Sequence, residues 1–536
     1  MIEQLKPEPA IEPASVPAEE FAAKKVRVRK RLRVRREGVP DEYWGIFQPL
    51  PRWVWGLALA LAAWGAFTVN PILTPFAVLL LPVLGSLLWF RGEPPVLAFG
   101  CAMQWVQGAA AVFYTNYFGV ALKTMPGGIE LLQATWLTLI GVLVLAIGMR
   151  LALLRRKKPA LTQVEDESRL LQPDRVFIWY LIAFVVFSVI ERVSFGIPGL
   201  RQPLLAATSL KWVLVFLLTY AVLAQQRYYA LLGVTICLEF ATGLLTYFAG
   251  FKDVFFLLLV VLTSTQFFHK RGRLLQICAV VAMMIVFGVV WTAIKGEYRE
   301  FLNQGSGQQE VVVSADQRAE KLGELVNGLD SAALESGLEQ AIMRMSYVSY
   351  FALCLAHVPE VVPHERGALW GGAIKHVLMP RIFFPNKPAI DDSVQTSRYT
   401  GLDVAGAGEG TSIALGYMAQ SYIDFGKWGM FAPIFLLGIF YGAIYRLFSS
   451  GRHKILGLAM ATAILIFSAS KVETSNIKLV GGNLMALIVI GLFAIFLAPA
   501  LWSSITAPAA QRPTRRKRRR RAEIGEAEGN DEKIEV

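Results

Sequence analysis

Five cations in this chain could bind an anion. Their positions are unexpected, because membrane proteins concentrate Lys and Arg in cytoplasmic loops and these five lie in connections expected on the opposite side. They lie in or beside polar connections between long apolar stretches: Lys252, Arg299, Arg344, Arg381 and Lys387. Arg offers a planar fork of donors that fits two phosphate oxygens, and Lys supplies a compact point charge. Several such groups converging on one place would suit a pyrophosphate. Each cation by itself could instead extend toward a membrane surface or pair with a nearby carboxylate.

Arg381 and Lys387 belong to the most distinctive local pattern, MPRIFFPNKP at 379–388. Its three prolines cannot share a regular helix, because proline fixes φ and removes a backbone donor. We expect a stiff extended hairpin or re-entrant loop that holds both cations at set positions.

Acid and base candidates surround this segment. Activation of a hydroxyl group needs a base within hydrogen-bond reach whose pKa is near the working pH. His376 lies shortly before Arg381, and Glu409 sits in the Gly-rich stretch GAGEG; either could instead be simply solvated. Asp391 and Asp392 could bind a divalent cation, but adjacent carboxylates without further ligands indicate no metal site. No metal or cofactor is predicted.

The composition is that of a multi-span membrane protein. The 536 residues are 55% hydrophobic and 17% charged, whereas soluble domains carry about 25% charged residues. The net charge of +13 is concentrated near the ends of the chain, so it predicts basic tails and no nucleic-acid surface. The four cysteines have neither a disulfide nor a zinc spacing.

Twelve apolar runs approach the length of about 20 residues that a spanning helix needs. They are 52–69, 72–90, 96–118, 131–153, 176–195, 204–224, 228–248, 253–268, 274–294, 428–448, 455–470 and 483–502. The predicted organisation is therefore a disordered basic tail (1–48), nine spans (49–294), a large polar connection (295–427), three spans (428–502) and a disordered basic and acidic tail (503–536).

The distribution of Lys and Arg sets the expected orientation. Strongly basic short connections, such as HKRGR at 269–273, all fall on the same side as both tails. Because cytoplasmic loops are enriched in cations, both termini are expected in the cytoplasm and 295–427 outside.

The large connection is too long to be a simple linker. Its segment 337–357, GLEQAIMRMSYVSYFALCLAH, could be a thirteenth span or an interfacial or re-entrant helix. We favour the second interpretation, since an odd count would place the basic C-terminal tail outside. Asp424, in YIDFGKWG, is expected to pair with Lys427 or to cap the following helix.

These motifs together resemble the Wzy-type oligosaccharide repeat-unit polymerases of bacterial O-antigen and exopolysaccharide pathways. The resemblance covers roughly 245–450 and rests on Gly250–Phe251–Lys252, Tyr298–Arg299, Arg344 with Ser346, MPRIFFPNKP and YIDFGKWG. The family often has an acid before the last element, where this chain has Gln420.

The resemblance implies an all-α polytopic protein of the bacterial inner membrane, with about 12 transmembrane helices, one large periplasmic loop and a GT-C-like glycosyltransferase architecture. It implies a metal-independent enzyme that polymerises undecaprenyl-pyrophosphate-linked oligosaccharides, with flippase and chain-length regulator proteins as possible partners besides membrane lipid. Lys252, Arg299, Arg344, Arg381 and Lys387 would then bind pyrophosphate, with Arg381, His376 and Glu409 as catalytic candidates.

Two other functions remain open. A ligase that moves glycan from the same lipid onto another acceptor would share the cationic site. A lipid-linked oligosaccharide flippase would also have about twelve spans, but it would be expected to lack the large outer loop and to carry charge within its helices.

Overall fold

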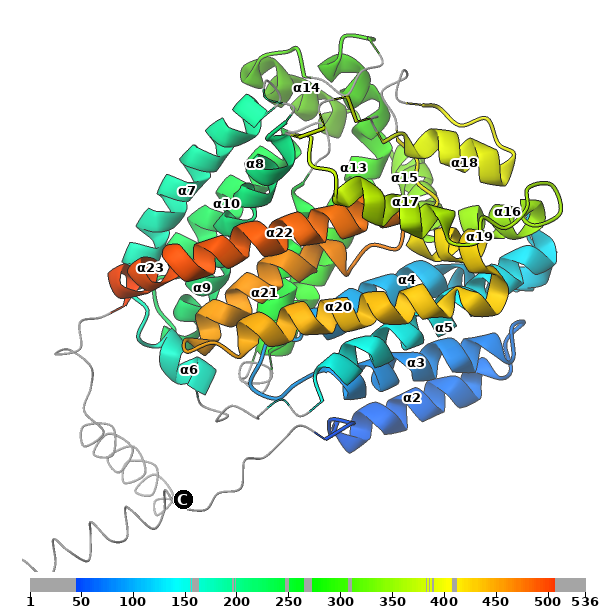
Figure 1. The fold of residues 1–536 in the computed structure, drawn as a ribbon, viewed down its shortest axis with the longest axis horizontal. Helices are drawn as coiled ribbons and strands as arrows, with labels where there is room; N and C mark the ends of the chain where they lie inside the picture. The colour runs from blue at the N-terminus through cyan, green and yellow to red at the C-terminus, as the bar shows by residue number, and fades with distance from the viewer. Residues whose placement is uncertain are drawn as a thin grey trace, which may run out of the picture. The chain divides into compact units, whose positions relative to one another are not determined.

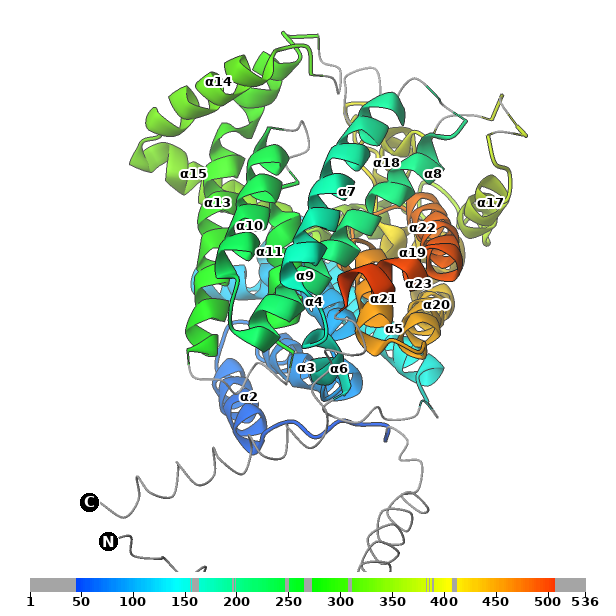
Figure 2. The same cartoon turned by 90° about the vertical axis from the view of Figure 1, so that its left-hand side faces the viewer.

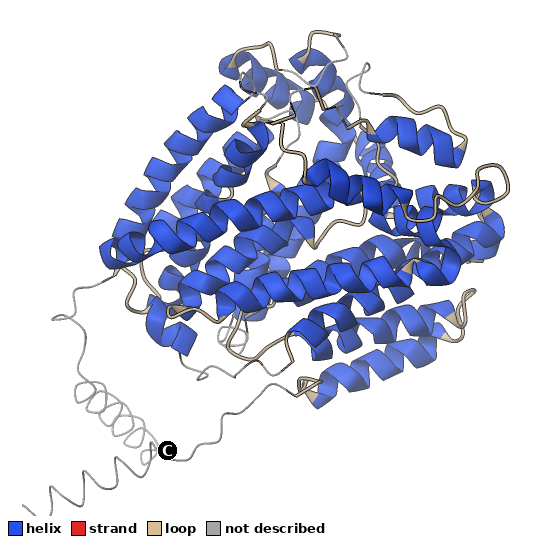
Figure 3. Ribbon diagram, viewed as in Figure 1, coloured by secondary structure: helices blue, strands red, loops and turns tan. Residues whose placement is uncertain are grey.

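The chain folds as a bundle of helices. The structure is a computed structural model that describes residues 45–154, 156, 163–194, 197, 199–245, 250–264, 272–306, 311–381, 383–384, 386–387, 390–406 and 412–506. Within these ranges the secondary structure is helical, apart from one isolated bridge between Leu171 and Thr506 (Figure 3). Almost all of both predicted tails lies outside the described residues.

Each of the twelve predicted spans overlaps a helix or a pair of helices in the described residues. These are α2 (Arg52–Gly65), α3 (Leu73–Leu88), α4 (Val96–Tyr117), α5 (Gly128–Ala152), α7 (Pro173–Ser194), α8 (Arg201–Thr208) with α9 (Leu210–Gln225), α10 (Tyr229–Leu244), α11 (Lys252–Leu262), α13 (Arg273–Leu302), α20 (Phe431–Ser449), α21 (Lys454–Ser468) and α22 (Asn476–Phe496).

Within the described ranges, seven helical stretches are long and apolar enough to cross a membrane. They are α4, α5, α7, α13, α20, α22 and the stretch Arg201–Gln225, which α8 and α9 form together. The prediction of an α-helical membrane protein is therefore confirmed. The count of twelve spans stays a prediction, because α2, α3, α10, α11 and α21 are shorter than a spanning helix needs.

The large connection is itself mostly helical. It contains α14 (Ala315–Asn327), α15 (Ser331–Met345), α16 (Val348–His357), α17 (Ala368–Val377), α18 (Asp392–Thr400) and α19 (Tyr417–Gly429). These helices gather at the upper and right-hand end of the bundle in Figure 1. The remaining elements are η1 (Leu122–Thr124), α6 (Gln163–Ser168) and α23 (Ala498–Ile505).

Two details differ from the predicted boundaries. Helix α13 continues to Leu302, beyond the expected end of the ninth span at 294. The segment 337–357 is divided between α15 and α16, with a break at Ser346 and Tyr347. It is therefore not one continuous span.

Glycines allow α5 and α20 to pack with their backbones in contact. A Cβ atom at Gly438 would lie 2.2 Å from the carbonyl oxygen of Leu145, and one at Gly442 would lie 2.4 Å from that of Met149. On α5, a Cβ at Gly148 would lie 2.3 Å from the Phe435 carbonyl oxygen. Small residues four apart permit such close approach between membrane helices, where no hydrophobic effect drives helices together. This pair supports the elements that carry the site.

Candidate functional site

Two glutamine side chains in the middle of α4 hold a non-helical segment between α21 and α22. Gln104 Nε2 donates to the Ala469 carbonyl at 2.7 Å, and Gln107 Nε2 donates to that of Ser470 at 2.9 Å. Gln107 Oε1 also accepts from the Val472 backbone N–H at 3.1 Å. Backbone outside a helix must find such internal partners when water is excluded. The break at 469–475 is thus fixed against a buried helix.

The break lies well away from either end of α4. Gln107 is about 15 Å from the Tyr117 end of the helix, at a rise of 1.5 Å per residue. Gly100 packs directly against Ala469, where an added Cβ would be 2.9 Å from the Ala469 Cβ. The residues of the break therefore lie deep in the bundle, level with the middle of a spanning helix.

Two further breaks reach the same level. Tyr347, between α15 and α16, donates its hydroxyl to the Ala414 carbonyl. Tyr417, the first residue of α19, donates its hydroxyl to Gln104 Oε1 at 2.7 Å. Just before it, Gly416 has φ +84° and lies against the break at 469–475, since a Cβ there would be 2.4 Å from the Val472 carbonyl oxygen. Three non-helical segments thus meet around α4.

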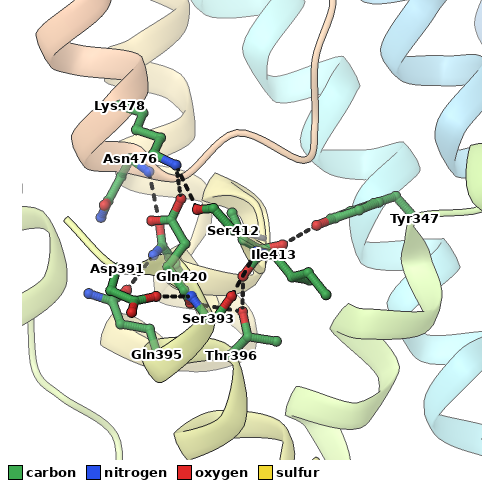
Figure 4. A network of polar contacts seen from close by, with 12 residues as sticks. Tyr347, Asp391, Ser393, Gln395, Thr396, Ser412, Ile413, Gln420, Asn476 and Lys478 are labelled. Carbon is green, nitrogen blue, oxygen red and sulfur yellow. Dashed lines mark hydrogen bonds and ion pairs between the residues drawn. The ribbon is translucent and has the colours of Figure 1, made fainter. Parts of the chain in front are cut away.

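A polar network joins these breaks (Figure 4). Lys478 Nζ, in the first turn of α22, lies 2.6 Å from Asp392 Oδ2 and donates to Ser412 Oγ at 3.0 Å. Gln420 Oε1 accepts from the Asn476 backbone N–H at 2.8 Å. Thr396 Oγ1 donates to the Ile413 carbonyl at 2.6 Å. The network holds α18, α19 and the start of α22 as one unit beside Tyr347. Its other members are Asp391, Ser393 and Gln395.

Charged side chains collect where the breaks meet. Lys252 lies at the start of α11. The charged residues near enough to interact electrostatically with it, its electrostatic neighbours, are Lys471, Asp253, Glu473 and Arg344. Helix α11 lies beside α4, with the rings of Phe256 and Phe99 5.5 Å apart. We call the set Lys252, Arg344, Lys471 and Lys295 the central cations.

The central cations extend onto α13. Lys295 has Arg344 and Arg299 as electrostatic neighbours, and Arg299 lies one turn further along the same helix. Gly337 brings α15 close to α13, because a Cβ there would be 2.9 Å from the Ala293 Cβ. Three of the predicted pyrophosphate-binding residues, Lys252, Arg299 and Arg344, are therefore brought together.

In the described part of the chain, none of the central cations forms an ion pair with a carboxylate. Lys252, Arg344 and Lys471 also form no hydrogen bond with the described residues. Lys252 and Arg344 are exposed, and Lys471 is half-buried. A group of cations without ion-pair partners, gathered where the helix breaks meet, is electrostatically suited to bind an anion.

The proline-rich segment has a different local structure from the expected extended hairpin. The Pro380 carbonyl accepts from the backbone N–H groups of Phe383 and Phe384, both at 3.0 Å, and Phe384 accepts from Lys387 at 3.1 Å. The described part of the segment is a series of turns. The described residues of the segment form no hairpin, because local i+3 and i+4 bonds satisfy the backbone without a partner strand. The alternative, a re-entrant loop, stays a prediction.

His376, Arg381 and Lys387 form a second group at the end of α17. Lys387 Nζ donates to the Met379 carbonyl at 2.9 Å and to the His376 carbonyl, so it caps the helix C-terminus. Burial lowers the pKa of the His376 imidazole, and the Lys387 and Arg381 charges lower it further. Burial, followed by the Arg381 charge, also lowers the pKa of Lys387.

The two groups lie on different sides of the bundle. Helix α17 packs against α22, whereas α15 packs against α13, and α15 and α17 lie at opposite edges of Figure 2. The structure therefore does not bring Arg381 and Lys387 to the central cations. Glu409, the other predicted base, lies outside the described residues.

The acidic residues of the large connection have structural partners. Asp391 caps α18 by accepting from the Ser393 N–H at 3.0 Å. Asp424 accepts from the Leu369 and Trp370 N–H groups at 3.0 and 2.8 Å. It thus caps α17 instead of the following helix, and burial raises the pKa of its carboxyl. In the described residues no cluster of three or more metal-binding side chains occurs.

Lys471 and Glu473 were not identified from the sequence. Both belong to SKVETSNIK, the connection before the last span. The signal was present, because Lys471 and Lys478 are also cations on the side where the charge bias argues against them. The connection is short, and nothing in its sequence indicates that it is held at the middle of α4.

Comparison with known proteins gives one match. Residues 131–471 match a family described as a domain of unknown function (DUF8712). The matched region runs from α5 to Lys471 and so includes all four central cations. No curated protein and no solved structure matches the chain.

Proposed function

The chain belongs to the DUF8712 family, and from its site we propose that it polymerises oligosaccharide repeat units carried on undecaprenyl pyrophosphate. The observation that carries the proposal is the group of unpaired central cations at the meeting of three helix breaks. In this proposal the protein is a glycosyltransferase, and the growing glycan moves from its lipid carrier onto a hydroxyl of an incoming lipid-linked unit.

The charge balance supports a pyrophosphate ligand. A charged side chain at membrane depth costs roughly 2.5–3.5 kcal/mol on insertion scales unless it is hydrated or paired. The four central cations outnumber the two carboxylates near Lys252, which are Asp253 and Glu473. A bound pyrophosphate would supply the missing negative charge. Arg344 would hold two of its oxygens, and the lysines would act as point charges.

The same cations would assist the chemical step. When the glycosyl bond breaks, negative charge builds up on the departing lipid pyrophosphate. Preorganised cations stabilise such charge, because they need no reorganisation during the reaction. The proposed mechanism therefore uses side-chain cations of this chain for charge neutralisation.

The second cation group has a place in this reaction. Polymerisation uses two lipid-linked substrates, a donor and an acceptor, and each carries a pyrophosphate. The attacking hydroxyl of the acceptor is separated from its own pyrophosphate by the length of a repeat unit. We assign the donor pyrophosphate to the central cations, and Arg381 with Lys387 to the carrier of the acceptor. Arg381 remains the predicted contact residue of that second group.

The proposal includes a topology. If the five shorter helices α2, α3, α10, α11 and α21 also cross the membrane, twelve spans result, with a GT-C-like architecture. Both termini would be cytoplasmic, and α14 to α19 would face the periplasm of a bacterial inner membrane. The central cations would then open toward the side where lipid-linked repeat units are joined.

The test replaces Arg344 or Lys471 with Ala in the producing cell and examines the lipid-linked glycans. Single repeat units should accumulate on the outer leaflet while the protein level stays normal. Lys123→Ala is the matched control, because Lys123 is an exposed cation in another connection. Unchanged polymer in both variants would contradict the proposal.

Two other outcomes would identify a different function. A lipid-linked polymer of normal length that fails to reach its final acceptor would indicate a ligase that uses the same donor. Repeat units trapped on the inner leaflet would indicate a flippase.

A further inference from the structure

One carboxylate is held beside the central cations by a rigid backbone. Glu473 follows Val472, whose N–H is bound by Gln107 at 3.1 Å. Gly416 packs on the same residues, and a Cβ there would lie 3.4 Å from the Glu473 Cα. Contacts on both sides therefore fix the position from which the Glu473 side chain extends.

The Glu473 side chain lies among charged groups and is less buried than its neighbour Val472. Val472 is buried and lines a narrow void with Tyr347, whereas Lys471 and Glu473 on either side of it are half-buried. Lys252 has both Lys471 and Glu473 as electrostatic neighbours, and Tyr347 also has Glu473 as a neighbour.

Glu473 is not committed to a structural partner. In the described part of the chain its carboxylate forms no hydrogen bond and no ion pair. Lys478, five residues further on, is engaged by Asp392 and Ser412. The other carboxylate beside Lys252, Asp253, has additional neighbours in Lys211 and Glu239. Glu473 is therefore available to a ligand.

We infer that Glu473 is the general base that accepts the proton of the attacking hydroxyl group. This inference rests on the proposed function. A base must lie near the anomeric carbon of the donor, and that carbon is bonded directly to the pyrophosphate that the central cations would hold. His376 belongs to the group on the other side of the bundle and is not placed for this role.

The step balances without another reactant. The acceptor oxygen forms a bond to the anomeric carbon while the bond from that carbon to the pyrophosphate oxygen breaks. The hydroxyl proton passes to the Glu473 carboxylate, and the electron pair of the broken bond leaves with the lipid pyrophosphate. Glu473 then releases its proton to water.

The test measures transfer and donor binding separately. The full-length protein in lipid nanodiscs would receive undecaprenyl-pyrophosphate-linked oligosaccharide as both donor and acceptor. Glu473→Gln should lower kcat about 10²- to 10⁴-fold, the usual contribution of a general base. Donor affinity should stay equal or increase, because a negative charge beside the anion is removed. Glu473→Asp should recover part of the lost kcat.

Two results would overturn the inference. One is a kcat of Glu473→Gln within threefold of the wild-type value. The other is a variant whose catalytic efficiency falls only because KM rises, with kcat unchanged. Glu335→Gln, at an exposed position of α15, is the matched control and should behave as wild type. If wild-type protein binds the donor but transfers nothing, the proposed function fails and this inference fails with it. If wild type transfers and Glu473→Gln transfers equally well, only the inference fails.

Discussion

The ion pair between the buried Asp392 and the partly exposed Lys478 leads to a specific prediction about stability. The Asp392 side chain is 2% exposed and the Lys478 side chain is 41% exposed, and their charged atoms lie 2.6 Å apart. Because the two partners differ in burial, removing Lys478 and removing Asp392 should lower the stability of the protein by different amounts. Lys478→Ala leaves a buried carboxylate without a counter-charge, whereas Asp392→Asn leaves a lysine that can turn to solvent.

The magnitude follows from this asymmetry. Breaking a fully buried pair by removing one partner costs roughly 3–5 kcal/mol. Because Lys478 is partly solvated, we expect about 2 kcal/mol for Lys478→Ala, and about 1 kcal/mol for Asp392→Asn, which keeps the shape of the side chain. The double variant should be more stable than Lys478→Ala alone, because the unpaired carboxylate is then absent.

The assay is thermal unfolding of the four proteins in one detergent, followed by intrinsic fluorescence. Lys478→Ala should have the lowest Tm, and adding Asp392→Asn should raise it. Lys375→Ala, an exposed lysine on α17, is the control and should leave Tm unchanged. Equal losses in the single variants that simply add in the double variant would refute the reasoning, since the pair would then contribute no interaction energy.

Three further predictions concern other parts of the fold. Gly438→Leu should lower the free energy of unfolding by at least about 3 kcal/mol, because backbone atoms occupy the position of an added Cβ. The peak of folded protein in size-exclusion chromatography should disappear in this variant, whereas Gly233→Leu should be tolerated. Lys387→Met should raise the pKa of His376 toward about 6.5 in an NMR titration. Since the folded-state pKa is lowered, the stability that His376 contributes above pH 6.5 should be lost as pH falls through that pKa. Asp424→Ala should cost about 2 kcal/mol in thermal unfolding, because two N–H groups of α17 lose their acceptor.

The sequence predicted the helices of the bundle well. Each apolar run overlaps a helix or a pair of helices in the described residues, because the hydrocarbon layer requires helices of a certain length and composition, and both can be recognised in a short stretch of sequence. The division of α15 from α16 at Tyr347 could not be read in the same way. It depends on a hydrogen bond to Ala414, which lies far along the chain.

The candidate site was predicted in part. Lys252, Arg299 and Arg344 were selected because they oppose the charge bias, and the structure brings them together. Arg381 was selected by the same reasoning, yet it lies with α17 on another side of the bundle. The enrichment of Lys and Arg in cytoplasmic loops indicates on which side of the membrane a cation is unexpected. It does not indicate where on that side the cation lies. The contacts of Gln107 with the break at 469–475, which place Lys471 and Glu473, are equally non-local.

The most direct measurement is to locate the bound donor. A lipid-linked oligosaccharide with a photoreactive group beside its pyrophosphate would be cross-linked to the purified protein, and the labelled peptides would be identified by mass spectrometry. We expect labels at 344–348 and 469–478, and we expect them to be lost when Lys252, Arg344 and Lys471 are all replaced by Ala. Labels confined to the region of α17, unchanged in that triple variant, would contradict the assignment of the donor pyrophosphate to the central cations.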